Sequence, residues 1–185
     1  MKNKLIQTKL ISELTGLFKQ KFNQDLISII LFGSIVKGNF TSTSDIDVLV
    51  VCETPPKDWR ARDKMVMELT EDIEIKYATP IHMTLVSKDE ISHAIESAYP
   101  LMLEIYDANE IIYDKNNFFR QLLEDFEKNI HRWHAKKIEE GVWKIPGLAV
   151  IESHFVMDGL TMNQNPSEKI TSIALKTCGN IMEIE

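Results

Sequence analysis

The chain has 185 residues, of which 26% are charged, and a formal net charge of −7 at pH 7. This length suits one domain, or one domain with a helical appendage, and it is sufficient to bury a core. The acidic balance argues against extended nucleic acid as a partner, because phosphate neutralisation needs Lys and Arg in excess, but it permits a small nucleotide that brings its own Mg²⁺. The sequence has no apolar run of membrane-span length and no signal-peptide pattern at its start, so we expect a cytoplasmic protein that does not enter a membrane.

The first part of the chain alternates between helical and strand patterns. Leucines and phenylalanines recur at helical spacing over residues 4–22, which predicts an amphipathic helix. Two short runs rich in Ile and Val, at residues 26–32 and 46–51, predict buried strands. A short helical turn is expected between them, at residues 35–37.

The next elements repeat this alternation. An apolar stripe predicts a helix over residues 57–77, and residues 81–86 read as a third strand. Ser87 and Glu90 have the spacing of a capping box, so another helix should begin there.

The second part of the chain is predicted to be mostly helical. We expect a short helix at residues 101–106, an edge strand at 110–113 and a longer helix from 116 to about 140. Gly141 fits a helix stop. Residues 148–185 carry a loop at 163–167 but no independent motif.

Two groups of positively charged and aromatic residues each allow two interpretations. One group lies near the start of the helix at 57–77 and could reach a nucleotide; the other lies near residue 133 and could form a platform for a base. In both places a solvated helix face or end is the preferred interpretation. The groups are Arg60, Arg62 and Lys64 in the first, and His131, Trp133 and His134 in the second.

The most informative stretch joins the two predicted strands. Gly33 and Ser34 follow the first strand, and Asp45 and Asp47 stand at the start of the second. Side chains alternate along a strand, so the two carboxylates should share one face, where a hard divalent cation such as Mg²⁺ would relieve their repulsion. Gly33 can adopt positive φ and allow close approach to the backbone, while Ser34 and the following amides can turn toward phosphate oxygens. Metal and phosphate ligands together indicate phosphoryl transfer.

The run Leu-Phe-Gly-Ser-Ile-Val-Lys-Gly at 31–38, followed by Ser-Asp-Ile-Asp-Val-Leu-Val at 44–50, resembles the signature of the DNA polymerase beta-like nucleotidyltransferases. It is most similar to the minimal nucleotidyltransferase branch, relatives of kanamycin nucleotidyltransferase. The resemblance implies an α/β (α+β) fold with a mixed central sheet flanked by helices. It also implies two divalent metal ions, Mg²⁺ or Mn²⁺, and transfer of a nucleoside monophosphate from a nucleoside triphosphate such as ATP.

The same resemblance assigns roles to individual residues. Asp45 and Asp47 would hold metal and act in catalysis, while Gly33, Ser34 and Ser44 would bind the triphosphate. Lys37 stands where the family often has Arg. It could neutralise phosphate or be an ordinary solvated loop charge, and both interpretations remain open.

One position departs from the family pattern. The third catalytic carboxylate of the family lies on the third core strand, and His82 occupies that place here. Imidazole is a softer ligand than carboxylate and brings no negative charge, but it can accept a proton near neutral pH. His82 is therefore a candidate site residue near the acceptor, or a core residue with a satisfied hydrogen bond. Glu74, at the end of the preceding helix, could substitute for the missing acid.

These observations predict a nucleotidyltransferase domain at 1–115 and a C-terminal helical extension at 116–185. The first functional hypothesis is a metal-dependent enzyme that modifies a hydroxyl of a small molecule or protein, with a protein partner or a homodimer as further expectations. The alternative is an antitoxin-like protein that binds a nucleotide or a partner with little turnover, because His82 replaces the third carboxylate.

Overall fold

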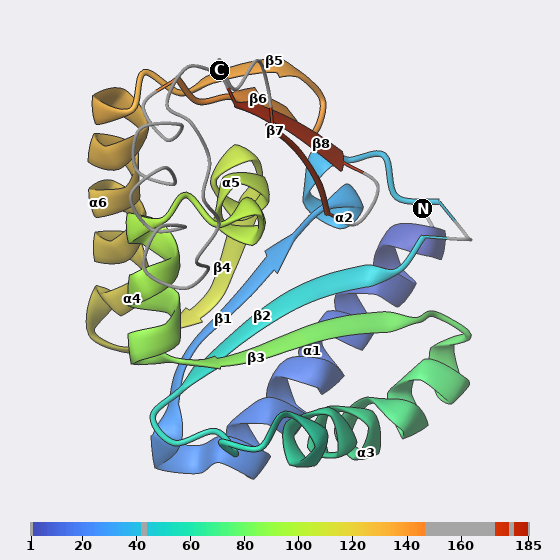
Figure 1. Cartoon of the computed structure of the whole chain (residues 1–185). Coiled ribbons are helices and arrows are strands. Elements are labelled where there is room, and N and C mark those ends of the chain that lie inside the picture. Colours follow the sequence, from blue (N-terminus) through green and yellow to red (C-terminus); the bar gives the residue numbers. More distant parts are fainter. Residues whose placement is uncertain (1, 42–43, 147–172, 178–179, 185) are drawn as a thin grey trace. The chain divides into compact units, whose positions relative to one another are not determined.

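The computed structural model describes residues 2–41, 44–146, 173–177 and 180–184. The chain divides into two compact units, Met1–His93 with Ile105–Leu122 and Ala94–Glu104 with Leu123–Glu185. No helix in the described part of the chain is long and apolar enough to cross a membrane. The elements are α1 (Lys2–Phe22), η1 (Asn23–Asp25), β1 (Leu26–Phe32), α2 (Ser34–Lys37), β2 (Ile46–Cys52), α3 (Trp59–Tyr77), β3 (Ile81–Ser87), α4 (Lys88–Glu96), α5 (Pro100–Asp107), β4 (Asn109–Asp114), η2 (Lys115–Asn117), α6 (Phe118–Arg132), β5 (Lys136–Glu139), β6 (Val142–Lys144), β7 (Ile173–Thr177) and β8 (Asn180–Ile184) (Figure 1).

The first unit is built on a four-stranded sheet in the order β3-β2-β1-β4. β1 runs antiparallel to both β2 and β4, whereas β2 runs parallel to β3. The parallel pair is connected through α3, as parallel strands require a crossover. Helices α1 and α3 lie on the same face of the sheet (Figure 1). The predicted mixed sheet flanked by helices is therefore confirmed.

The core of the first unit contains the apolar residues of β1 and β2. All seven residues of β1 are buried, and Asp47 is the one residue of β2 that is not. Ile46 and Val48, on either side of Asp47, are completely buried in the same apolar cluster as Leu14 and Phe18 of α1. Each such side chain contributes roughly 1.5–3 kcal/mol when fully buried. The apolar residues of β2 therefore hold the strand in the core, as the run rich in Ile and Val predicted.

The predicted capping box at the start of α4 is confirmed. The Glu90 N–H donates to Ser87 Oγ (3.1 Å), and the Ser87 N–H donates to Glu90 Oε2 (2.7 Å). Arg62 donates two bonds to the Glu90 carboxylate and others to the carbonyls of Pro56 and Leu85. The Arg62 hydrogen bond is the main reason that the pKa of Glu90 is lowered. Arg62 therefore ties the loop before α3 to the end of β3 and is not part of a solvated helix face.

The helix expected from 116 to about 140 ends earlier, at Arg132. His134 adopts a left-handed conformation with φ of 54°, and the Ala135 N–H donates to the Ile130 carbonyl (3.0 Å). This pattern is that of a Schellman-type helix end. Gly141, with φ of 72°, lies in the turn between β5 and β6 instead of stopping a helix.

The prediction of a helical C-terminal extension needs the same correction. After α6, the regular structure in the described residues is strand, arranged in a sheet of order β5-β6-β8-β7. Short runs on either side of a glycine with positive φ favour a hairpin over a helix. The loop expected at 163–167 lies outside the described residues. The boundary between residues 115 and 116 stays a prediction, and the compact units are divided differently.

Trp133 is part of the apolar interior of the second unit. It is 2% exposed, and its ring meets that of Phe126 edge-to-face with centroids 6.1 Å apart. His131 and His134 are exposed. The Trp133 ring is therefore too buried to serve as a platform for a base.

Candidate active site

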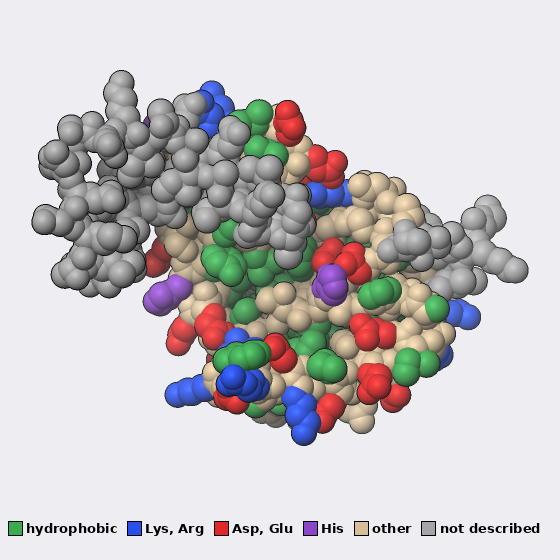
Figure 2. Space-filling model, turned by 45° about the vertical axis from the view of Figure 1, so that its right-hand side comes forward, with side chains coloured by type: hydrophobic (Ala, Val, Ile, Leu, Met, Phe, Trp, Pro, Cys, Tyr) green, Lys and Arg blue, Asp and Glu red, His purple; other side chains and the backbone are tan. Residues whose placement is uncertain are grey.

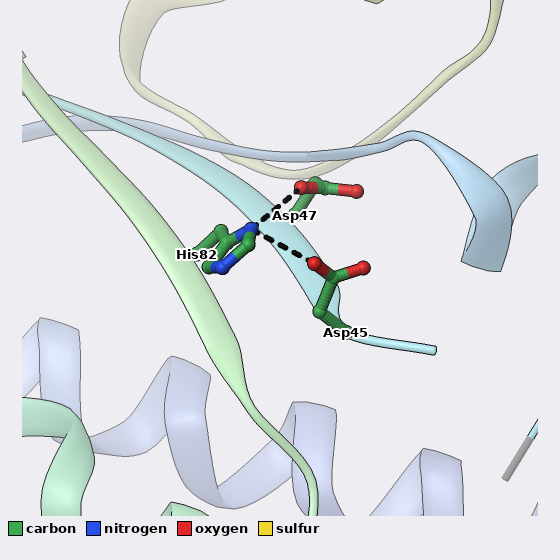
Figure 3. Close-up of side chains that lie close together, drawn as sticks. All are labelled: Asp45, Asp47 and His82. Atoms are coloured by element: carbon green, nitrogen blue, oxygen red, sulfur yellow. Dashed lines mark ion pairs between the residues drawn. The ribbon is translucent and has the colours of Figure 1, made fainter. Parts of the chain in front are cut away.

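The two predicted metal ligands, Asp45 and Asp47, and the candidate site residue His82 come together at the end of the parallel strand pair. Asp45 directly precedes β2, Asp47 lies on β2, and His82 is paired with Asp47 in the register of β2 and β3. His82 Nδ1 lies 2.9 Å from Asp45 Oδ2 and 3.7 Å from Asp47 Oδ1 (Figure 3). One ligand atom from each residue lies within 4.8 Å of the others. Among the described residues, this is the group of His, Cys, Asp and Glu that could hold a metal ion.

The donor set suits one divalent cation. Two carboxylates on one face repel each other, and a cation between them would offset that repulsion. Carboxylate oxygens are the ligands that Mg²⁺ and Mn²⁺ prefer, whereas the imidazole nitrogen of His82 suits softer divalent ions better. Asp45 and Asp47 therefore fit the metal that the family implies, and His82 completes the set with a weaker ligand.

Gly33 brings the turn after β1 against one of these carboxylates. Its φ of 69° lies in the left-handed region, which residues with a Cβ rarely adopt. A Cβ at this position would overlap Asp47 Oδ2 and lie 3.1 Å from Asp47 Cγ. Position 33 therefore requires glycine for two reasons. One is the backbone conformation, and the other is that the Asp47 carboxylate occupies the space that a side chain would need.

Ser34 and Ser44 stand on either side of the loop. The Oγ atom of Ser34 is buried and has no hydrogen-bond partner among the residues that the structure describes. Ser44 Oγ accepts a bond from the Thr41 N–H (3.0 Å) and so supports the turn before Asp45. A buried hydroxyl without a partner is uncommon, since the unmade hydrogen bond destabilises the protein. Triphosphate binding by either serine stays a prediction.

Lys37 is not a solvated loop charge. Its ammonium lies 3.4 Å from Asp107 Oδ2, and the two side chains are only 18% and 16% exposed. Asp107 ends α5, far from Lys37 in the sequence. No spacing pattern would have revealed this partner. A role for Lys37 in neutralising phosphate stays a prediction.

Glu74 does not take the place of the missing carboxylate. Its Oε1 accepts a hydrogen bond of 2.6 Å from the Ile81 N–H, at the first residue of β3. Within the described residues, the metal-ligand group contains Asp45, Asp47 and His82 and not Glu74. The Glu74 carboxylate is therefore hydrogen-bonded to the backbone next to the site.

One known protein family matches most of the chain. The family described as "Nucleotidyltransferase domain" matches residues 11–150. The chain belongs to this family. The match confirms the resemblance that the Gly-Ser and Asp-Ile-Asp motifs carry, and it makes the chain a member of a family of transferases of phosphorus-containing groups.

Two relatives come from Methanocaldococcus jannaschii. "Putative protein adenylyltransferase MJ1305" is 38% identical over 131 residues, which cover 70% of this chain and 88% of the relative. "Putative protein adenylyltransferase MJ0604" is 29% identical over 93 residues, which cover 50% of this chain and 86% of the relative. The chain thus spans most of the length of both relatives.

Solved structures show more distant similarity. A toxin-antitoxin complex with AMP-PNP contains a chain that is 18% identical, with a TM-score of 0.44 and coverage of 80% of this chain and 97% of that one. Spectinomycin adenyltransferase AAD(9) from Enterococcus faecialis, with ATP and spectinomycin, is 17% identical, with a TM-score of 0.46 and coverage of 68% and 64%.

Proposed function

We propose that this nucleotidyltransferase family member transfers the adenylyl group of ATP to a hydroxyl group, and that Asp45 and Asp47 hold the divalent metal. The observation that carries the proposal is the contact between Gly33 and the Asp47 carboxylate. It brings the turn that would bind phosphate directly against a residue that would bind metal. A nucleotide whose phosphates lie along that turn would present its metal-bound oxygens to the two aspartates.

The chain's own residues would mainly position the reactants. Gly33 leaves the backbone open to the phosphates, and the buried Ser34 hydroxyl could donate to a phosphate oxygen. Asp45 and Asp47 would hold the divalent cation, which neutralises charge on the phosphates when it is bound. The acceptor oxygen forms a bond to the α-phosphorus, the bond between that phosphorus and the bridging oxygen breaks, and pyrophosphate leaves.

His82 would receive the proton that the acceptor hydroxyl loses. Its imidazole is 68% exposed at the edge of the site, so an acceptor can approach it from solvent. A neutral imidazole can accept a proton near neutral pH, provided that it lies within hydrogen-bond reach of the hydroxyl. The contact of 2.9 Å between His82 Nδ1 and Asp45 Oδ2 would orient the ring for this purpose.

A protein side chain is the acceptor class that the relatives favour, since both are named as protein adenylyltransferases. A small hydroxylated molecule is the other class. We propose a protein partner or a second copy of the chain as the source of that side chain. On the face drawn in Figure 2, acidic side chains lie among basic ones. The formal net charge of −7 supports the expectation that extended nucleic acid is not the acceptor.

Label transfer from α-labelled ATP tests the proposal. The full chain would be incubated with candidate protein and small-molecule acceptors in Mg²⁺ and in Mn²⁺. We expect transfer by the wild type and a loss of about a thousandfold in Asp45→Asn with Asp47→Asn, because the metal would lose both carboxylate ligands. The matched control is Asp63→Asn with Asp72→Asn, which removes two exposed carboxylates of α3. Equal transfer by the double mutant and its control would contradict the metal assignment.

A second function, binding with little turnover, is favoured by one observation. The His82 nitrogen lies where a third carboxylate oxygen would strengthen the hold on a metal. In that case ATP and metal would bind in a calorimetric titration that the Asp45→Asn, Asp47→Asn variant abolishes, while label transfer stayed at background for every acceptor. Detectable transfer by the wild type rejects this alternative.

A further inference from the structure

One peptide unit next to the candidate active site is held from both sides. The carbonyl of Pro80 accepts a hydrogen bond from the Ile46 N–H of β2 (2.9 Å). The N–H of the same peptide unit, which belongs to Ile81, donates to Glu74 Oε1 of α3 (2.6 Å). Ile46 lies between the two aspartates, and Ile81 directly precedes His82. This single peptide unit therefore connects Glu74 to the backbone of all three site residues.

Glu74 also organises the end of α3. Its backbone carbonyl accepts bonds from the N–H groups of Ala78 and Thr79, and Ala78 adopts the left-handed conformation that ends the helix. A hydrogen bond from a backbone N–H to a carboxylate is roughly twice as strong as one between neutral groups. Through its carbonyl and its carboxylate, Glu74 thus fixes both ends of the short turn from α3 into β3.

The position of this turn matters because β3 is an edge strand. It pairs with β2 on one side and with no other strand of the described residues, so neighbouring strands restrain it on one side alone. His82 is its second residue and depends on the start of β3 for its distance to the aspartates. A displacement of about 1 Å in such a group can change a rate about a hundredfold.

We infer that Glu74 is a positioning residue of the proposed active site: its carboxylate sets the start of β3 against β2 and thereby the spacing between His82 and the aspartates. Glu74 does not touch the reacting atoms. The inference rests on the proposed function for its effect on catalysis, but its effect on the strands can be measured independently.

The test uses the full chain with Glu74→Ala, Glu74→Gln and the control Glu71→Ala, which removes an exposed carboxylate from the same helix. Three quantities are measured in folded protein: the dissociation constant for Mn²⁺, the rate of label transfer, and the hydrogen-exchange rate of the Ile46 amide. We expect Glu74→Ala to weaken Mn²⁺ binding about tenfold, as loss of a ligand-orienting group does, and to accelerate Ile46 exchange. Glu74→Gln keeps an acceptor oxygen and should restore most of both, while Glu71→Ala should match the wild type.

Two results would overturn the inference. A purely structural role would lower the unfolding temperature of Glu74→Ala and leave the Mn²⁺ affinity of the folded protein unchanged. Unchanged Ile46 exchange would show that the carboxylate does not hold the peptide unit. If the wild type bound no Mn²⁺, the proposed function would fail at its metal site, whereas Ile46 exchange would still decide the role of Glu74. Should Glu74→Ala not fold, Glu74→Asp, with its shorter reach, must show weaker Mn²⁺ binding than Glu74→Gln.

Discussion

Asp47 and His82 are direct neighbours in adjacent strands, yet their surroundings differ. Asp47 is 22% exposed on a strand that pairs on both sides, and its carboxylate fills the space beside Gly33. His82 is 68% exposed on the edge strand. The candidate site therefore has a closely packed half, formed by β1 and β2, and an open half, formed by β3.

The difference shows where the chain tolerates change. In the packed half, a new atom meets the Asp47 carboxylate directly, and the surrounding core leaves little room to adjust. In the open half, a different side chain at position 82 can extend into solvent. The replacement of a family carboxylate by His82 falls in the half where a substitution disturbs the rest of the site least.

Among the single substitutions compared here, Gly33→Ala should have the largest effect on label transfer. Gly38 adopts the αL conformation, so Gly38→Ala should lower the free energy of unfolding by about 1 kcal/mol. Gly33, with φ of 69° and ψ of −148°, lies in a region that essentially only glycine adopts, so Gly33→Ala should lower it by more. Gly33→Ala places its Cβ on the Asp47 carboxylate, whereas no atom of the described residues lies within 4 Å of a Cβ at Gly38. We expect Gly33→Ala to lower label transfer about a hundredfold and Gly38→Ala to retain it. Similar transfer rates in the two folded variants would contradict the conclusion that the half of the site formed by β1 and β2 is closely packed around Asp47.

Ser34→Ala should have a smaller effect in the same half. The buried Oγ has no partner in the described structure, so its removal should leave the unfolding transition nearly unchanged. If the hydroxyl donates to a phosphate, ATP affinity should fall about tenfold, as measured by calorimetry. Ser92→Ala, which removes a hydroxyl bonded to the Lys88 carbonyl of α4, is the control. Equal ATP affinity in both variants would argue against phosphate binding by Ser34.

Substitution of His82 should change the rate of label transfer several-fold, and the direction of the change distinguishes two roles. His82→Asp supplies a hard oxygen ligand and negative charge, so Mg²⁺-dependent transfer should rise if His82 acts as a weak metal ligand. Transfer at neutral pH should fall if His82 is the working general base, since a carboxylate is a weaker base. We expect weak wild-type transfer, stronger in Mn²⁺, and a fall in His82→Asp from the proton-accepting role proposed above, whereas a gain would assign His82 as a weak metal ligand; His131→Asp controls for added charge. An active wild type that His82→Ala leaves intact would exclude a catalytic role.

The smallest expected effect is a change in the free energy of unfolding, and it concerns the far end of β3. The pKa of Glu90 is lowered chiefly by its hydrogen bond with Arg62, so the stabilising contribution is present above the unfolded-state pKa of Glu and is lost as the pH falls through the lower folded-state pKa. Because this pair is partly exposed, Glu90→Gln should lower the free energy of unfolding at pH 7 by only about 1 kcal/mol. Urea unfolding at pH 7 and pH 3 measures it. A difference between wild type and variant that does not shrink at pH 3 would contradict the ion-pair account.

Much of the first unit could be predicted from sequence because its signals are local. The apolar runs of β1 and β2, the Ser87–Glu90 spacing and the glycine before Ser34 each depend on residues that lie within a few positions of one another. The same reasoning placed Asp45 and Asp47 on one face. It failed after Arg132, where the charged residues following α6 resemble a helix end but pair as strands.

The sequence by itself determined the buried strands, the caps and the residue types of the candidate site. The tertiary structure decided which of those residues meet: His82 with the aspartates through the register of β2 and β3, Gly33 with Asp47, Lys37 with Asp107, and Glu74 with the Ile81 peptide. Local patterns arise from backbone geometry and burial over a few residues. Register and long-range contacts arise from how whole elements pack, and no short stretch of sequence contains that information.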